Sequence, residues 1–392
     1  MAFGRSWLKE WTLDPAGTYL NHGTVGVTPR RIMDVQRALI DETERHPSRF
    51  VLREQTFHAP GTWRPKAPRL REAAAVVADF VGVDHDDLVF VDNATTGANA
   101  VLRSFRFEPG DEVLVTDLGY GGVTRAAQFA AREHGATVRT ITMPYPFTAL
   151  GLVEACVKAV GPRTRLAVLD HIAADSAVVL PLTQIASALR ARGVAVLADG
   201  AHAPAAIPLD IPALGVDWYV ANLHKWAWTP RSSGFLWAPK ERQAGLHPAV
   251  VSWGLDEGFT QEFDLPGTRD ASTHLSAPAA LALFAEWGLD DIRHHNHTLA
   301  WTGAHRLAER WGTTFDTPEA LVGPMATVML PERAGTTRAA AMAMRDALLF
   351  DDGIEVHVQA YRERVQVRIS AQIYNDMTDI DRLAEAVLRH VA

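Results

Sequence analysis

Cysteine is nearly absent from this chain of 392 residues. Cys156 is its single cysteine, so the chain can form no internal disulfide and no zinc site built on several thiolates. This scarcity fits a reducing compartment, and we expect a cytoplasmic protein.

Long hydrophobic runs and an excess of positive charge are also missing. No stretch approaches the roughly 18–20 consecutive apolar residues that a membrane helix needs. The start of the chain lacks the apolar centre of a secretory signal peptide. The formal net charge is −8, which argues against a nucleic-acid-binding surface. We therefore expect a soluble protein whose partners include neither nucleic acid nor membrane.

What the chain does contain is an alternation of short apolar strands with amphipathic helices. Strands are predicted at 88–91, 112–115, 137–141, 166–169, 194–198, 218–220 and 234–237, and helices at 94–105, 122–134, 150–160 and 182–192. This alternation is typical of an α/β fold with a mostly parallel central sheet covered by helices. Uninterrupted apolar strands fit burial on both faces of that sheet.

After about residue 270 the pattern favours a smaller α+β domain with an antiparallel sheet. Helices are predicted at 277–287, 292–310, 337–349 and 378–390, and strands at 326–330, 354–358 and 365–370. We predict three parts: an N-terminal segment (1–45) that packs with the small domain, a large domain (46–270) and a small C-terminal domain (271–392). The glycine-punctuated stretch 20–29 predicts a fixed irregular loop rather than a helix, and its glycines allow close backbone approach.

Four chemical groups are expected beyond the carboxyl ends of strands, where open parallel sheets bind ligands. Lys225 and Asp199 each follow a buried strand, Tyr120 follows another, and small and hydroxyl residues at 94–96 begin a helix whose free N–H groups suit a phosphate. Singly these features have ordinary explanations: a surface lysine, helix caps, a half-buried tyrosine. Together they are what pyridoxal phosphate requires: a Schiff-base lysine, a carboxylate for the ring nitrogen, an aromatic ring and a phosphate seat.

Several short motifs resemble those of one enzyme family. Asp199-Gly200-Ala201-His202 and His224-Lys225-Trp226 are specific at this separation. With them the chain resembles the fold-type I pyridoxal-phosphate enzymes of the class V aminotransferase group, and within it the isopenicillin N epimerase-like family. The resemblance covers nearly the whole chain and also includes 20–29, 93–95, Tyr120, His171, 267–270 and 368–370.

The resemblance implies a role for each matching residue. The catalytic set would be Lys225, Asp199, His202 and Tyr120. Lys225 would form the internal aldimine and carry the Cα proton, Asp199 would pair with the pyridine nitrogen, and His202 would contact the phenolic oxygen. The phosphate would be bound by Ala94, Thr95, Asn222 and His224, and Gly267 and Thr268 would reach the phosphate of the partner subunit in a homodimer. Arg368 would bind the substrate α-carboxylate, and Asn21, His22 and Gly23 are candidates for the substrate side.

The resemblance implies an amino acid, or a compound derived from one, as substrate and a quinonoid intermediate, but leaves the reaction open. Epimerisation and β-elimination, such as C–S cleavage, have equal weight, with transamination behind them. Cys156 lies in a predicted helix of the large domain, so a persulfide-forming desulfurase is not expected. Ala173, Ala174 and Asp175 depart from the Asn, Ser or Thr that relatives tend to carry there, which puts the reaction type in question.

Two alternatives from other classes remain open at this point. A metal-dependent hydrolase could use some of the 16 histidines, since His294 and His297 share a predicted helix face next to His295. No carboxylate–histidine motif supports it, and no metal site is expected. The other alternative is a non-catalytic binding protein built on the same fold.

Overall fold

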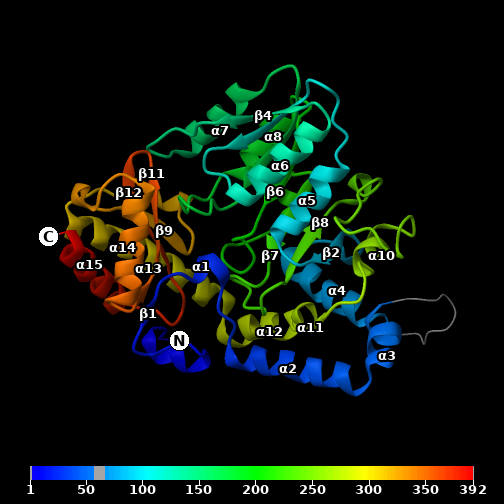
Figure 1. Ribbon diagram of the computed structural model, residues 1–392, viewed down its shortest axis with the longest axis horizontal. Coiled ribbons are helices and arrows are strands. Elements are labelled where there is room, and N and C mark those ends of the chain that lie inside the picture. Colours follow the sequence, from blue (N-terminus) through cyan, green and yellow to red (C-terminus); the bar gives the residue numbers. More distant parts are fainter. Residues whose placement is uncertain (1, 57–66, 392) are drawn as a thin grey trace.

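The computed structural model describes residues 2–56 and 67–391. Its large domain is built on one seven-stranded sheet with the strand order β2-β8-β7-β6-β5-β3-β4 (Figure 1). All pairings among β3 to β7 are parallel, and β8 runs antiparallel to both of its neighbours. The strands are β2 (Leu88–Val91), β3 (Glu112–Thr116), β4 (Thr137–Ile141), β5 (Thr164–Asp170), β6 (Ala195–Asp199), β7 (Trp218–Asn222) and β8 (Gly234–Trp237). The predicted α/β class is confirmed.

Side chains along the strands of this sheet alternate between two hydrophobic cores, one on each face, and the edge strand β2 shows the pattern. Leu88 and Phe90 of β2 belong to one core, and Val89 and Val91 belong to the other, as the two-residue period of a strand requires. The first core is covered by α4 (Arg69–Val81), α7 (Ala149–Ala159), α8 (Leu182–Arg190) and α12 (Ala277–Trp287). The second is covered by α5 (Ala94–Ser104), α6 (Gly121–Glu133) and α10 (Phe259–Asp264).

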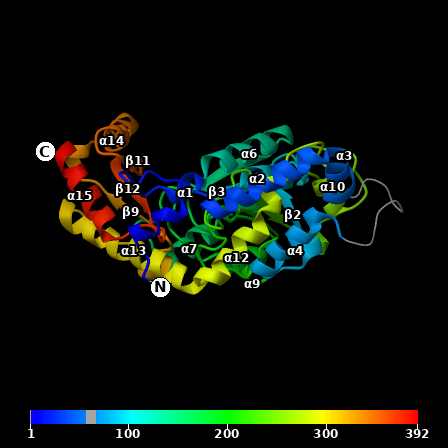
Figure 2. The same cartoon turned by 90° about the horizontal axis from the view of Figure 1, so that it is seen from below.

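The small domain contains a three-stranded sheet that is antiparallel, as predicted, and its strand order is β11-β12-β9. Its strands are β9 (Met325–Met329), β11 (His357–Tyr361) and β12 (Arg364–Ser370), and its helices are α13 (Leu289–Trp311), α14 (Arg338–Phe350) and α15 (Met377–Val391). Figures 1 and 2 both place α14 and α15 at the opposite end of the molecule from α3 (Pro47–Arg49).

Two local predictions are corrected by the structure. The strand expected at 354–358 is divided at Val356, because β10 (Ile354–Glu355) leaves to pair in parallel with β1 (Thr18–Tyr19). The loop expected at 20–29 contains a single helical turn, α1 (His22–Val25). Shorter or connecting helices are α2 (Arg30–Arg45), α9 (Ile211–Leu214) and α11 (Ser272–Leu275).

The boundaries of the three predicted parts remain predictions, but the cores show where packing changes. α12 and Ile292 of α13 pack into the first core of the large domain, whereas α13 joins the small-domain core from Leu299 onward. The N-terminal segment contacts both domains, since Trp11 and Ile32 lie in the large-domain core and Leu20 in the small-domain core. Among the described residues, no helix is both long and apolar enough to span a membrane.

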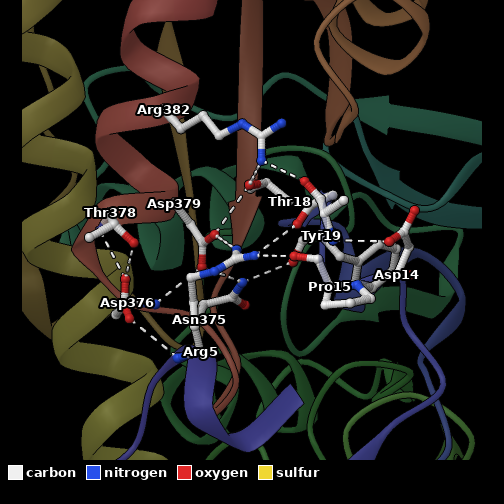
Figure 3. Close-up of polar contacts among 12 residues, drawn as sticks. Arg5, Asp14, Pro15, Thr18, Tyr19, Asn375, Asp376, Thr378, Asp379 and Arg382 are labelled. Atoms are coloured by element: carbon white, nitrogen blue, oxygen red, sulfur yellow. Dashed lines mark hydrogen bonds and ion pairs between the residues drawn. The ribbon is translucent and has the colours of Figure 1, made fainter. Parts of the chain in front are cut away.

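A buried carboxylate fastens the N-terminal segment to α15 (Figure 3). Asp379 forms an ion pair with Arg5 and accepts hydrogen bonds from Thr18 Oγ1 at 3.2 Å and Asn375 Nδ2 at 3.1 Å. Its side chain is almost completely shielded from solvent. Thr18 belongs to β1, and the glycine-punctuated stretch 20–29 begins directly after β1. The cluster therefore fixes the position at which this stretch begins.

Asp379→Ala should lower the free energy of unfolding by about 3 kcal/mol, because the substitution leaves buried donors without their charged acceptor. Urea denaturation followed by circular dichroism measures this loss. Asp381→Ala removes an exposed ion pair between the same helix and Arg306, so it is the matched control and should have a far smaller effect. Equal losses in the two variants would contradict the assigned role.

Candidate active site

Three neighbouring strands end in polar residues at one edge of the large sheet. β5 ends at Asp170, β6 at Asp199 and β7 at Asn222, and Asp170 is the register partner of Asp199. Lys225 follows shortly after Asn222. The parallel topology therefore brings together residues that are far apart in the sequence, at the edge where open α/β sheets bind their ligands.

Lys225 presents an amine that is largely, but not fully, withdrawn from solvent. Its Nζ lies 3.2 Å from His202 Nε2. Burial, followed by the positive charge of Arg368, lowers the pKa of Lys225 to about 8, while the carboxyls of Asp199 and Asp170 act in the opposite direction. A lysine with a lowered pKa supplies the neutral amine that attacks a carbonyl carbon.

His202 is held in one tautomer by its neighbour Trp226. The indole Nε1–H of Trp226 donates to His202 Nδ1 at 3.3 Å, and an imidazole that accepts at Nδ1 carries its proton on Nε2 when it is neutral. Burial, assisted by the charge of Lys225, holds the pKa of His202 well below its usual value. The Nε2–H therefore faces Lys225 Nζ and can donate to the lone pair of the neutral amine.

Asp199 is a buried carboxyl without a charged partner in direct contact. It is 3% exposed, and its Oδ1 accepts the N–H of Ala201 at 3.0 Å. Across residues 2–56 and 67–391, no Arg, Lys or His lies within ion-pair distance of it. An unpaired buried carboxylate is costly, and a protonated ring nitrogen would relieve that cost. Lys225 and Asp199 thus supply the amine and the carboxylate that a pyridoxal ring requires.

The first turn of α5 leaves one backbone donor for a phosphate. The Asn93 side chain caps the helix by accepting the N–H of Thr96 at 3.0 Å, and Asn222 Oδ1 accepts the N–H of Ala94 at 2.8 Å. The N–H and hydroxyl of Thr95 have no partner among the described residues. A helix N-terminus with a free N–H and a hydroxyl is suited to an anion.

Asn222 and His224 also lie near this turn, and each already forms one hydrogen bond within the chain. Asn222 uses its side-chain oxygen to hold Ala94 in place, and its amide NH₂ group remains a donor. His224 Nδ1–H donates to the carbonyl of Ser233 at 2.9 Å, which leaves its Nε2 available. Both residues can therefore contact a phosphate held at Thr95.

Arg368 lies on β12 with its guanidinium directed toward the N-terminal segment and residue 174. It donates to the carbonyl of Ala174, to Thr24 Oγ1 at 2.7 Å and to Asn21 Oδ1 at 3.3 Å, and its Nε has no partner. Burial lowers its pKa to about 10, so it remains charged at neutral pH. No carboxylate neutralises it by direct contact within the described chain, which is the condition expected of a group that binds an anionic substrate.

His22 supports the backbone of Lys225. It is fully buried, with Nε2–H donating to the carbonyl of Lys225 at 3.0 Å and Nδ1 accepting from Tyr374 Oη at 2.9 Å. Burial lowers the pKa of His22 to about 4. Both ring nitrogens are committed, so the role on the substrate side that the sequence favoured stays a prediction without a free ring atom to perform it.

The glycines of this segment allow the close approach that the sequence predicted. Gly26 has φ +68°, and a Cβ on it would lie 1.9 Å from the carbonyl oxygen of His224. A Cβ on Gly23 would lie 2.5 Å from Met325 Sδ. The loop is therefore pressed against the segment that carries Lys225, and Asn21 bridges to Ser370 of β12.

Other predicted residues lie at the surface of the chain or outside the site. Tyr120 is 49% exposed at the start of α6. Gly267 and Thr268 are exposed, which leaves them accessible to a second subunit. The alternative metal site is not formed: His295 bonds to the carbonyl of Asn375, His297 bonds to that of Val322, and the described residues bring no metal-binding group together there.

Asp170 is a site residue that the sequence reasoning missed. It ends the strand next to Asp199 and is 6% exposed. Its Oδ1 accepts the N–H of Tyr120 at 3.3 Å. The sequence contains a signal for this residue: Asp170 follows an apolar run at 166–169, just as Asp199 follows the apolar run at 194–198.

Comparison with known proteins identifies the family. Residues 66–383 match the aminotransferase class-V family, so the chain belongs to that family. It is 33% identical to a putative L-cysteine desulfhydrase of Oryza sativa subsp. japonica, over 95% of this chain and 83% of that protein. It is 32% identical to an isopenicillin N epimerase of Streptomyces clavuligerus, over 96% of this chain and 95% of that protein.

A solved structure of a lysine-to-alanine variant of C-DES, with glycine covalently linked to its PLP cofactor, superposes with a TM-score of 0.75. The identity is 22%, and the superposition covers 95% of this chain and 96% of that one, so it shows the fold alone. The resemblance seen in the motifs is confirmed: the protein is a fold-type I, class V enzyme whose cofactor is pyridoxal phosphate. Its relatives divide between lyases and epimerases at similar identity.

The rate at which the apoenzyme takes up pyridoxal phosphate should rise with pH through a midpoint near 8, because only the neutral amine of Lys225 reacts. Initial rates of cofactor-band formation across a pH series measure this. Arg368→Gln removes a cation that lowers the pKa of Lys225 and should move the midpoint to higher pH. Arg364→Gln, on the same strand, is the control and should leave it unchanged. A midpoint near the usual lysine value of about 10.4 would contradict the proposed environment.

Trp226→Phe should release His202 from its single tautomer, because the indole donor to Nδ1 is lost while an aromatic ring remains. Nitrogen-15 NMR of histidine-labelled protein should show the Nδ1–H form appearing at His202. Trp228→Phe is the matched control, since the buried Nε1 of Trp228 has no hydrogen-bond partner to lose. An unchanged His202 tautomer in Trp226→Phe would refute the assignment.

Proposed function

We propose that this enzyme catalyses β-elimination from a cysteine-like amino acid, that is, C–S lyase chemistry. The observation that carries the proposal is the scarcity of uncommitted proton carriers beside Lys225. His22 and His202 use both ring nitrogens, and His171 is buried with its Nδ1 bonded to Tyr219 Oη at 2.8 Å. Elimination needs one base at Cα, whereas two-base epimerisation needs a second proton carrier on the opposite face.

Substrate binding follows from the charges at the site. Arg368, whose Nε is unpartnered, binds the α-carboxylate, and its Thr24 and Asn21 contacts hold the guanidinium in place. Thr95, with Asn222 and His224, would hold the cofactor phosphate, and Asp199 would pair with the ring nitrogen. When bound, pyridoxal phosphate supplies an electron sink that stabilises the negative charge left at Cα.

Lys225 then performs the proton transfers. Its neutral amine removes the Cα proton, the Cβ–S bond breaks with both electrons leaving on sulfur, and the ammonium of Lys225 can return a proton to the departing thiolate. His202 Nε2–H orients the amine during this exchange. For L-cysteine the balanced outcome is cysteine plus water giving hydrogen sulfide, pyruvate and ammonia.

Cys156 takes no part in this chemistry. It is fully buried in α7, and burial raises the pKa of its thiol to about 12, so a thiolate that could accept sulfur is not formed. This supports release of sulfur as a free thiol or sulfide rather than as an enzyme persulfide.

We also propose a homodimer with a shared active site. Val250, Val251 and Trp253 are strongly exposed, with Trp253 86% exposed, and a run of exposed apolar residues marks a protein interface. Gly267 and Thr268 lie shortly after this run and are free to reach a partner. A symmetric pairing would place them at the partner's cofactor phosphate.

Epimerisation of an amino-acid derivative is the second candidate. The observation in its favour is the share of each relative that aligns with this chain. The alignment covers 95% of the Streptomyces clavuligerus epimerase and 83% of the rice desulfhydrase. Tyr120, half-exposed at the start of α6, is the residue here that could act as a second proton carrier.

Incubation of the holoenzyme with L-cysteine and other amino acids in D₂O separates the two. Sulfide and pyruvate released in equal amounts support the lyase; a D-isomer carrying deuterium at Cα, without pyruvate, supports the epimerase and refutes the lyase. Lys225→Ala should lower turnover by at least about 10³-fold. Cys156→Ala is the control and should retain activity; its loss would mean that the thiol takes part.

A further inference from the structure

Two buried carboxyls end adjacent parallel strands beside Lys225, and the predicted chemistry uses only one of them. Asp170 and Asp199 are register partners on β5 and β6 and are 6% and 3% exposed. Neighbouring strands lie about 5 Å apart, so two negative charges here would repel each other in a poorly solvated place. A proton on one of the two carboxyls would remove this repulsion.

The surroundings of the two carboxyls decide which one remains protonated. Burial raises the pKa of Asp199 as well, but the N–H of Ala201, which donates to it at 3.0 Å, and the positive charge of Lys225 both favour its anion. Asp170 receives one longer hydrogen bond, from the N–H of Tyr120 at 3.3 Å, and it faces the charges of Asp199 and Asp175. Burial and then the charge of Asp199 raise the pKa of Asp170 well above its ordinary value.

The carboxyl of Asp170 is also in contact with the turn that carries Tyr120. Oδ1 accepts the N–H of Tyr120, and Oδ2 would lie 3.4 Å from a Cβ placed on Gly119. That turn connects β3 to α6, and Tyr120 directly precedes the helix. Asp170 thus links the edge of the sheet to the turn that carries the half-exposed Tyr120.

We propose that Asp170 is a positioning residue: a neutral carboxylic acid that holds the Tyr120 turn against the cofactor site and leaves Asp199 as the single anion there. As a neutral group it accepts the Tyr120 N–H through its carbonyl oxygen. It adds no second negative charge to compete with Asp199 for the ring nitrogen. This role does not depend on whether the enzyme eliminates or epimerises.

The test compares Asp170→Asn with Asp170→Ala. Asparagine has the shape of the neutral acid and keeps the carbonyl acceptor for Tyr120, so its dissociation constant for pyridoxal phosphate should stay within about threefold of the wild type. Alanine removes the acceptor and should weaken cofactor binding about tenfold, in line with the loss of one hydrogen bond. Equilibrium titration of the apoenzyme, followed by the cofactor band, gives both constants.

A second measurement reports the proton directly. Infrared difference spectra of wild-type protein in H₂O and D₂O should contain the C=O stretching band of a buried carboxylic acid, and Asp170→Asn should lack it. The infrared comparison uses only the wild type and Asp170→Asn, so it still tests the proposal if Asp170→Ala fails to fold.

Two results would overturn the proposal. If Asp170→Asn binds the cofactor as poorly as Asp170→Ala, the residue acts as an anion. If no carboxylic-acid band exists, or if Asp170→Ala binds the cofactor like the wild type, Asp170 neither carries the proton nor positions the turn. Because none of these readouts uses turnover, failure here is separate from failure of the lyase assignment.

Discussion

The withdrawal of one lysine amine from water is the constraint on which the rest of the site depends. A lysine among polar groups would ordinarily stay protonated and inert as a nucleophile. Here burial and the Arg368 cation lower its pKa to about 8, and every imidazole in contact with it is itself neutral because burial lowers its pKa. The positive charge of the site is therefore confined to Arg368 and to the protonated form of Lys225. The anionic groups of the cofactor and substrate would balance that charge.

Contacts from outside the large sheet also determine the position and the pKa of Lys225. Lys225 is positioned by His22, which the N-terminal segment inserts beneath its carbonyl. That segment is bonded to β12 through Asn21 and to α15 through Arg5 and Asp379. Because Arg368 lies on the same β12, the small domain carries the cation that lowers the pKa of the amine. It also anchors the N-terminal segment, whose His22 supports the backbone of Lys225. A shift of the small domain would alter substrate binding and amine basicity together.

The large sheet and the central pair of Lys225 and Asp199 could be predicted from the sequence because their signals are local. A buried apolar strand followed by a polar residue appears within about ten residues, and parallel topology then determines which ends converge. What could not be predicted depends on partners far away in the chain. His22 meets Tyr374 and Lys225 across separations of 352 and 203 residues, and the division at Val356 depends on β1, which no local pattern near residue 356 reveals.

The fate of the substrate carbanion rests on where protons are held, and the chain controls this with neutral groups. Trp226 fixes the proton of His202 on the nitrogen facing Lys225, and Tyr374 fixes that of His22 on the nitrogen facing the Lys225 carbonyl. Each ring therefore has a single orientation of donor and acceptor and no spare proton to offer the substrate. With those positions closed, the proposed function assigns to Lys225 both the uptake of the Cα proton and its return to the leaving group.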